Sequence, residues 1–347
     1  MTEITKTSAK GGAVLRWLFA AAFIFAVAAS GLFAGLLNKA GLFYLAFGSV
    51  AAALMGFTGR EIAAAFRLAA GQAGDESALG KAAYFWGAAA RNAWILGALG
   101  SALNFIITLS RVSGGIADIS NRMIQSFIVI LYGLVLAVVC LVPAMKLSGR
   151  IEGARLLGGT RPAPEARRGS PAAVRAMTPD RIIGYVLFAA VLVLTVIFII
   201  KGQPQAGPLP IGKLLLHWPA YLVVFGGAIA LSLFMGAGAG AQAWTLGFAM
   251  TGLIGLLMGL IQALFGFAHR DLAGISSAVA FIISASVLTL LGFVAVAAPL
   301  EDREVMDGRR EGPRPLSRFF WVLLPLLTFI FLILTFIMVV TPMTKPG

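Results

Sequence analysis

The 347-residue sequence has little of what enzymes and metal proteins use, since it contains one cysteine, two histidines and only 12% charged residues. A single cysteine, Cys140, excludes an intrachain disulfide framework and a multi-cysteine metal site. The histidines lack metal-ligand spacing, and the sequence has no Ser-His-Asp arrangement, acid pair or phosphate-binding glycine loop. We therefore expect no enzymatic activity, no catalytic residues, no cofactor and no metal site.

Acidic side chains are also missing from the long apolar runs, because all 14 Asp and Glu residues lie outside them. A carboxylate inside a bilayer is costly and usually marks an ion or proton path. A proton-coupled transporter that acts alone would need one. The sequence therefore disfavours that class.

The sequence is rich in apolar residues: 59% of its residues are hydrophobic, its mean hydropathy is +0.93, and it contains 41 glycines. A soluble domain could not cover so much apolar surface, so the expected solvent is lipid. We predict an all-α, polytopic transmembrane helical bundle with about nine spans. The expected spans are 17–37, 41–58, 92–110, 124–145, 182–200, 218–236, 243–267, 274–300 and 319–340.

The net charge of +13 is unevenly distributed between these runs. If the N-terminus lies inside, most Lys and Arg residues fall in cytoplasmic segments, which is the positive-inside pattern. We therefore expect a multi-pass protein of the bacterial inner membrane, with a cytoplasmic N-terminus and an outer C-terminus. The basic segments are expected to contact anionic lipid, and nucleic acid is not an expected partner.

The membrane part reads as two copies of one unit. Ile116–Ser120 is echoed by Leu272–Ser276, and Pro143 is echoed by Pro299 at the same spacing, which indicates a duplication into two parallel four-span repeats plus one extra C-terminal span. The expected organisation is a first repeat over 1–147 with a cytoplasmic insert at 59–91, a basic linker over 148–180, a second repeat over 181–300, a charged cytoplasmic loop over 301–318, and a ninth span with an outer tail over 319–347.

The insert in the first repeat has helical character. Asp75, Glu76 and Ser77 precede an alanine-rich run, as residues at a helix N-terminus do. The second repeat has only the glycine-rich hairpin 236–240 at this place. The two copies are therefore expected to differ at the cytoplasmic side.

Small and mildly polar residues recur inside the expected spans. Close helix packing explains glycines on one helix face, and a narrow lumen is the functional alternative. The candidate packing or pore glycines are Gly97, Gly100, Gly252, Gly255 and Gly259. The candidate ion-path residues are Ser101, Asn104, Ser286 and Thr289, although membrane hydroxyls often bond to their own helix. Pro143 and Pro299 are candidate hinge prolines.

These motifs resemble the MotA/TolQ/ExbB proton-channel family. In the first copy the matching residues are Gly97, Gly100, Ser101, Ile116–Ser120, Tyr132–Leu134, Ala137 and Pro143. In the second copy they are Pro219–Gly227, Gly252–Leu264 and Pro299, which are more similar to the MotA branch.

The resemblance implies a stator or energy-transducer subunit that forms a homo-oligomeric ring around single-span partner helices. The MotB/TolR/ExbD-like partner would supply an intramembrane Asp, and the ring would couple proton or sodium motive force to mechanical work such as motility, or to envelope energy transduction. Each copy keeps one expected hydroxyl, Ser101 in the first and Ser286 in the second. Two alternatives stay open: a non-conducting scaffold with the same fold, and a solute transporter built from two parallel repeats.

Overall fold

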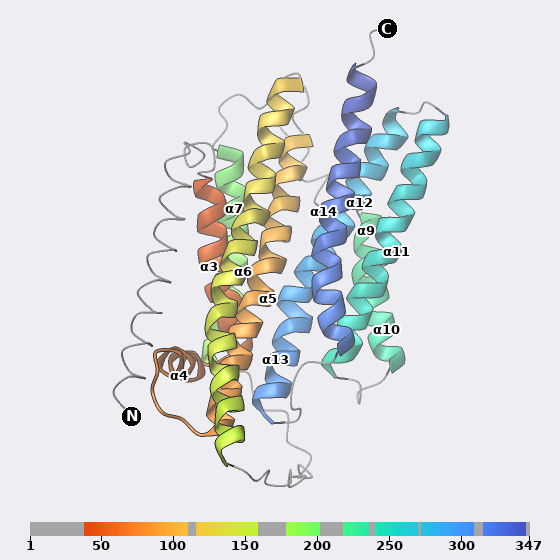
Figure 1. Cartoon of the computed structure of the whole chain (residues 1–347). Coiled ribbons are helices and arrows are strands. Elements are labelled where there is room, and N and C mark those ends of the chain that lie inside the picture. The colour runs from red at the N-terminus through yellow and green to blue at the C-terminus, as the bar shows by residue number, and fades with distance from the viewer. Residues whose placement is uncertain are drawn as a thin grey trace. The chain divides into compact units, whose positions relative to one another are not determined.

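The computed structural model of the chain describes residues 38–109, 116–158, 178–201, 218–235, 240–269, 272–308 and 315–344 (Figure 1). Regular secondary structure in these ranges is helical throughout. The expected span 17–37 and residues 159–177 of the expected linker lie outside the described ranges, as do residues 236–239 of the expected hairpin.

The helices of the first part of the chain are α3 (Lys39–Gly56), α4 (Gly59–Ala69), α5 (Glu76–Leu109), α6 (Ile116–Gly158) and α7 (Pro179–Lys201). The helices of the second part are α9 (Trp218–Tyr221), η2 (Leu222–Gly226), α10 (Gly227–Met235), α11 (Ala241–Ala268), α12 (Leu272–Gly292), η4 (Phe293–Ala297), α13 (Ala298–Met306) and α14 (Pro315–Thr344). Both segments labelled η are π-helical turns.

Local capping explains where the two helices of the insert begin. Thr58 and Glu61 form a reciprocal capping box at the start of α4. At the start of α5, the carboxylate of Asp75 accepts a hydrogen bond of 2.7 Å from the backbone N–H of Ala78. The helix start that the sequence predicts at Asp75–Ser77 is thus present, and the insert contains two helices separated by a short turn.

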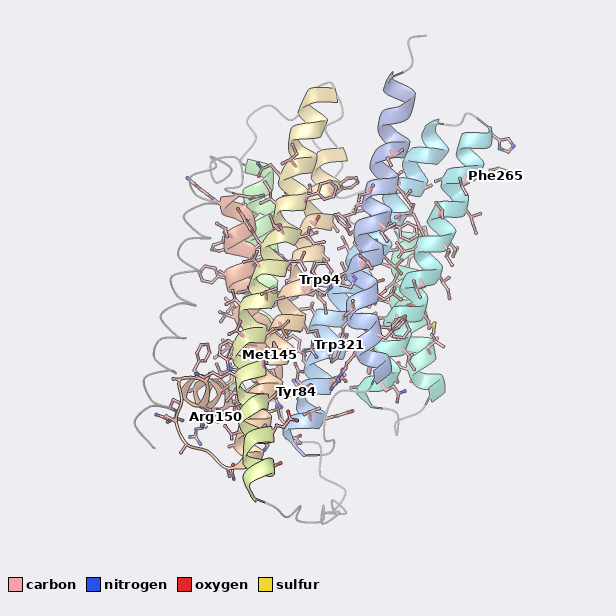
Figure 2. The ribbon with its side chains drawn as sticks, in the orientation of Figure 1. Tyr84, Trp94, Met145, Arg150, Phe265 and Trp321 are labelled. Carbon is pink, nitrogen blue, oxygen red and sulfur yellow. The ribbon has the colours of Figure 1, made fainter. Side chains whose placement is uncertain are left out.

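Helix α4 is held against α6 through its C-terminal carbonyl groups. Lys146 Nζ donates to the carbonyl of Ala69 at 3.0 Å, and the Arg150 guanidinium donates to the carbonyls of Leu68 and Gln72 at 2.9 Å each. Basic side chains at the C-terminal end of a helix satisfy carbonyls that have no partner within that helix. Figure 2 shows Arg150 beside α4.

Neither of the candidate hinge prolines ends its helix. Helix α6 runs through Pro143 to Gly158, so the first residues of the expected linker continue this helix. Pro299 lies in the first turn of α13, directly after the π-helical turn η4. Proline clashes with the carbonyl four residues back in a regular helix, and a widened turn relieves that clash. The helix therefore continues to Met306, where the sequence suggests a loop from residue 301.

Two of the four apolar clusters in the described core share α12. One cluster joins α3, α5, α6, α7 and α14 to Val279, Ile283 and Val287 of α12. The other joins η2, α10, α11 and α14 to Phe281, Ala285 and Leu288 on a different face of α12. Helix α12 is therefore the shared central element of the described bundle.

Large apolar side chains remain exposed on the outer helices. On α6, Val135, Val138 and Val142 are each more than half exposed, and on α11 so are Ile261 and Phe265. Such faces would be unfavourable in water and are expected where lipid or another membrane helix covers them.

Four helices in the described ranges are long and apolar enough to cross a membrane: Lys39–Gly56, Ile124–Glu152, Ala241–Phe265 and Ser277–Met306. Two shorter apolar helices are Trp218–Leu233 and Arg318–Leu334. The chain is thus an all-α membrane protein.

Candidate functional site

A buried ion pair joins α5 to α13 at one end of the bundle. The Nη2 group of Arg91 donates to both carboxylate oxygens of Asp302, at 3.0 and 2.8 Å. The side chains of Arg91 and Asp302 are 4% and 0% exposed. Arg91 and Asp302 thus form a bidentate ion pair that is shielded from solvent. We call the end of the bundle where it lies the charged end.

Three further side chains enclose the pair. Tyr84 donates its hydroxyl hydrogen to Asp302 Oδ1 at 2.9 Å, and Arg91 Nε donates to Asn92 Oδ1 at 3.0 Å. The guanidinium carbon of Arg91 lies 4.3 Å from the ring centroid of Trp321, in cation–π geometry. Tyr84 and Trp321 are labelled in Figure 2.

The backbone of α3 comes so close to Asp302 that a side chain at Gly56 would force α3 or Asp302 to shift. A Cβ atom at Gly56 would lie 2.7 Å from Asp302 Oδ2. The site is therefore assembled from α3, α5, α13 and α14, and its charges are neutralised inside the protein.

Burial and the neighbouring charges keep Tyr84 in its protonated form. Burial raises the pKa of Tyr84 above its usual value, and the neighbouring negative charge of Asp302 raises it further. Tyr84 therefore remains a protonated hydrogen-bond donor to Asp302 at all physiological pH values.

Sequence reasoning misses this site. Glu301 and Asp302 follow Pro299 in a charged stretch and therefore resemble the start of a loop, yet they are 2% and 0% exposed. One sequence signal could have revealed it: proline is favoured in the first turn of a helix. The charged residues after Pro299 could therefore have been assigned to a helix that starts at this proline.

The candidate ion-path hydroxyls are buried inside the bundle. Ser286 Oγ donates to the carbonyl of Ile282 at 3.0 Å, and Thr289 Oγ1 donates to the carbonyl of Ala285 at 2.7 Å, so each bonds to its own helix. Ser101 is 0% exposed, and its Oγ has no hydrogen-bond partner. Asn104 is half-buried on the same helix as Ser101.

All five candidate glycines lie where helices pack closely. A Cβ atom at Gly97 would lie 2.9 Å from the Cα of Gly133, and one at Gly100 would meet Tyr44 and Val129. In the second part of the chain, Gly252 faces Thr289, Gly255 faces Ala285, and Gly259 faces Ile282. The glycines are therefore contact points between α5 and α6 and between α11 and α12.

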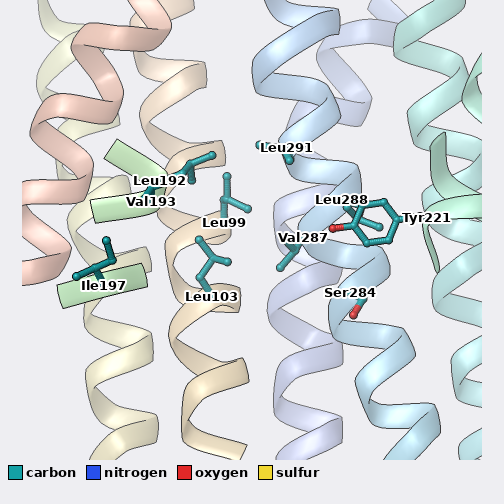
Figure 3. A pocket seen from close by; sticks show the side chains of 10 residues that line it. All are labelled: Leu99, Leu103, Leu192, Val193, Ile197, Tyr221, Ser284, Val287, Leu288 and Leu291. Atoms are coloured by element: carbon teal, nitrogen blue, oxygen red, sulfur yellow. The ribbon is translucent and has the colours of Figure 1, made fainter. Parts of the chain in front are cut away.

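A separate apolar pocket of about 360 Å³ lies between α5 and α7 on one side and α9 and α12 on the other (Figure 3). Its lining includes the leucines Leu99, Leu103 and Leu288, with the hydroxyls of Tyr221 and Ser284 on one wall. The candidate residues Ser101, Asn104, Ser286 and Thr289 are not among the lining residues.

These features define the class as a helical membrane protein whose glycines pack the helices together and whose charged end contains a neutralised ion pair. Comparison with known proteins adds no narrower assignment. No protein-family model matches the chain, and neither a curated protein nor a solved structure matches it significantly.

Proposed function

We propose that this chain is an integral membrane subunit of the stator or energy-transducer type. It forms a homo-oligomeric ring around single-span partner helices and couples proton or sodium motive force to mechanical work or envelope energy transduction. The resemblance of its motifs to the MotA/TolQ/ExbB proteins motivates this function. The structure supports it through the packing of two helix pairs.

The observation that carries the proposal is that the helix pairs α5/α6 and α11/α12 meet at equivalent positions. Pro143 and Pro299 are 156 residues apart, and the same offset aligns Gly133 with Thr289, while an offset of 155 aligns Gly97 with Gly252. Gly97 contacts Gly133 in the first copy, and Gly252 contacts Thr289 in the second. Likewise Gly100 meets Val129, as Gly255 meets Ala285. Matched contacts are expected if one packing unit was duplicated, and they support two parallel four-span repeats.

The state of Asp302 also fits a wall subunit. Asp302 is fully buried, but Arg91 neutralises it and Tyr84 donates to it. A carboxylate in this state is not available to bind a passing ion. In the proposed ring, the ion-binding carboxylate comes from the Asp of the MotB/TolR/ExbD-like partner.

The proposal includes the topology that the charge distribution favours. The chain crosses the bacterial inner membrane about nine times, with its N-terminus in the cytoplasm and its C-terminus outside. The charged end then faces the cytoplasm, and its basic residues contact anionic lipid.

Co-purification tests the proposed function. Mild solubilisation of the full chain from its native membrane is expected to recover an oligomer together with a small single-span protein that carries an intramembrane Asp. Recovery of a monomer without that partner, in a detergent that preserves the fold, would contradict the proposal.

A specific observation favours a second candidate, a non-conducting scaffold with the same helical architecture. The hydroxyls of Ser286 and Thr289 are occupied by their own helix carbonyls. Hydroxyls in this arrangement already have a hydrogen-bond acceptor in their own helix, so their presence inside the bundle is explained without an ion path.

Replacing Ser101 and Ser286 by alanine distinguishes the two candidates. The channel proposal predicts loss of most ion flux across vesicles that contain the assembled complex, because the wall then lacks both expected hydroxyls. The scaffold proposal predicts unchanged function. Ser232→Ala is a matched control, since this serine is only partly buried and bonds to the carbonyl of Ile229 within its own helix. Oligomer size, measured in parallel, must stay the same for either conclusion.

A further inference from the structure

The N-terminus of α7 lies beside the corner between α3 and α4. The carbonyl of Thr178 accepts from the backbone N–H groups of Arg181 and Ile182, which sets the first turn of α7. The carboxylate of Asp180 accepts from the backbone N–H of Gly59 at 3.0 Å and so ties this turn to the start of α4.

Two glycine contacts place α7 and α13 against the same end of α3. A Cβ atom at Gly184 would lie 2.6 Å from the backbone nitrogen of Met55, and one at Gly56 would touch Asp302. Arg181 precedes Gly184 by three residues and shares its helix face, while Arg303 follows Asp302 directly. Both arginines thus lie near the C-terminal end of α3.

Polar hydrogens at this place are buried and have no acceptor. Arg181 is 6% exposed, and its Nε group has no hydrogen-bond partner. Arg303 and Thr178 are half-buried, but the Nε and Nη2 atoms of Arg303 and the hydroxyl oxygen of Thr178 are themselves buried and also have no hydrogen-bond partner. Buried donors of this kind are normally paired, and a buried charge without a partner is costly.

Acidic groups stand close to Arg303 in the chain, at Asp302, Glu304 and Asp307, but none of them accepts a hydrogen bond from the unmet donor atoms of Arg181 and Arg303. Burial lowers the pKa of Arg181, and the like charge of Arg303 lowers it further, while Asp307, Glu61 and Tyr185 act in the opposite direction. The Glu61 carboxylate already accepts from the backbone N–H and the hydroxyl of Thr58. An anion between the two arginines would offset the repulsion between their positive charges and would accept hydrogen bonds from the donor atoms that have no partner.

We propose that Thr178, Arg181 and Arg303 form a binding site for a phosphate group at the N-terminus of α7. Guanidinium groups match the oxygens of phosphate geometrically, and the N-terminus of a helix favours a negative charge. Arg181 immediately precedes the expected span 182–200, which is the depth of lipid headgroups. That depth makes the phosphodiester of an anionic phospholipid the expected source, with free inorganic phosphate as the soluble source of the same chemistry. The site does not depend on the stator assignment.

The test uses the purified, delipidated full chain and native mass spectrometry, with melting temperature as a second readout. The probes are phosphatidylglycerol, diacylglycerol with the same acyl chains, and inorganic phosphate. Arg303→Gln and Arg181→Gln are each expected to weaken phosphatidylglycerol binding about tenfold or more, because each removes charge-assisted hydrogen bonds. Arg67→Gln, an exposed arginine of α4, is the matched control and should bind as the unmodified chain does.

Each outcome decides the proposal. Binding of phosphatidylglycerol that depends on the arginines supports the site with a headgroup source, and displacement of that lipid by inorganic phosphate supports the site with a soluble source. If diacylglycerol binds as tightly as phosphatidylglycerol, or if the arginine variants bind as well as the Arg67 control, the proposal is wrong. Should Arg181→Gln fail to fold, Arg303→Gln and Thr178→Val give the same comparison.

Discussion

Replacing Asp302 by alanine is expected to destabilise the folded protein by about 3–5 kcal/mol, the cost of leaving one partner of a buried ion pair without the other. The change leaves the Arg91 guanidinium buried against Trp321 with no carboxylate. It also removes the acceptor for the Tyr84 hydroxyl. Thermal unfolding of the purified chain in a mild detergent measures the effect as a large fall in melting temperature.

The double variant Arg91→Met, Asp302→Leu shows whether the loss of stability comes from breaking the ion pair or from emptying the space that its side chains fill. Because apolar residues of similar volume can replace a buried ion pair at little cost, the double variant should regain most of the stability lost in Asp302→Ala. Glu152→Ala, which changes an exposed acid near the C-terminal end of α6, should leave the melting temperature unchanged. If Asp302→Ala melts like the Glu152 control, Asp302 does not have the structural role described above.

Replacing Gly133 by alanine is expected to cost about 1–3 kcal/mol by overpacking the contact between α5 and α6. A Cβ atom at Gly133 would lie 2.7 Å from the Cα of Gly97 and 2.8 Å from the carbonyl oxygen of Ala93. Both are backbone atoms, so no side chain can rotate away and the helices must separate. Melting temperature and resistance to denaturing detergent should both fall.

Helix α6 also provides the control for this change. Gly149 has no heavy atom within 4 Å of the position where its Cβ would lie. Alanine at this position should stabilise the helix by up to about 1 kcal/mol, because glycine is the poorer helix former. Opposite effects of the same substitution in one helix would separate helix contact from helix propensity. Equal effects would show that the contact between Gly97 and Gly133 is not important for stability.

The helical class and several helix boundaries could be predicted because they depend on local signals. The apolar runs correspond to helices in the described ranges, and Asp75 stands at the start of α5 as a cap. The sequence suggests a loop from residue 301, but residues 301–306 are helical, because proline is tolerated in the first turn of a helix and Pro299 lies in the first turn of α13. The π-helical turn before Pro299 provides the space that the proline ring needs. No periodicity in the sequence predicts this turn.

The ion pair could not be predicted, because it depends on which helices meet. Arg91 and Asp302 are separated by most of the chain, and each is preceded or followed by other charged or polar residues that are equally plausible partners. The same limit applies to Ser286 and Thr289. Their positions in an apolar run are visible in the sequence, but whether a hydroxyl faces a path or its own helix carbonyl depends on the rotamer that packing selects.

The length of α6 has a mechanical consequence. Its 43 residues extend about 65 Å at 1.5 Å per residue, roughly twice the 30 Å hydrocarbon thickness of a bilayer. The same rigid rod therefore contacts Gly97 near its middle and holds the carbonyls of α4 through Lys146 and Arg150. A displacement of α4 cannot be absorbed by a loop, because the helix that holds α4 is the same helix that packs on α5.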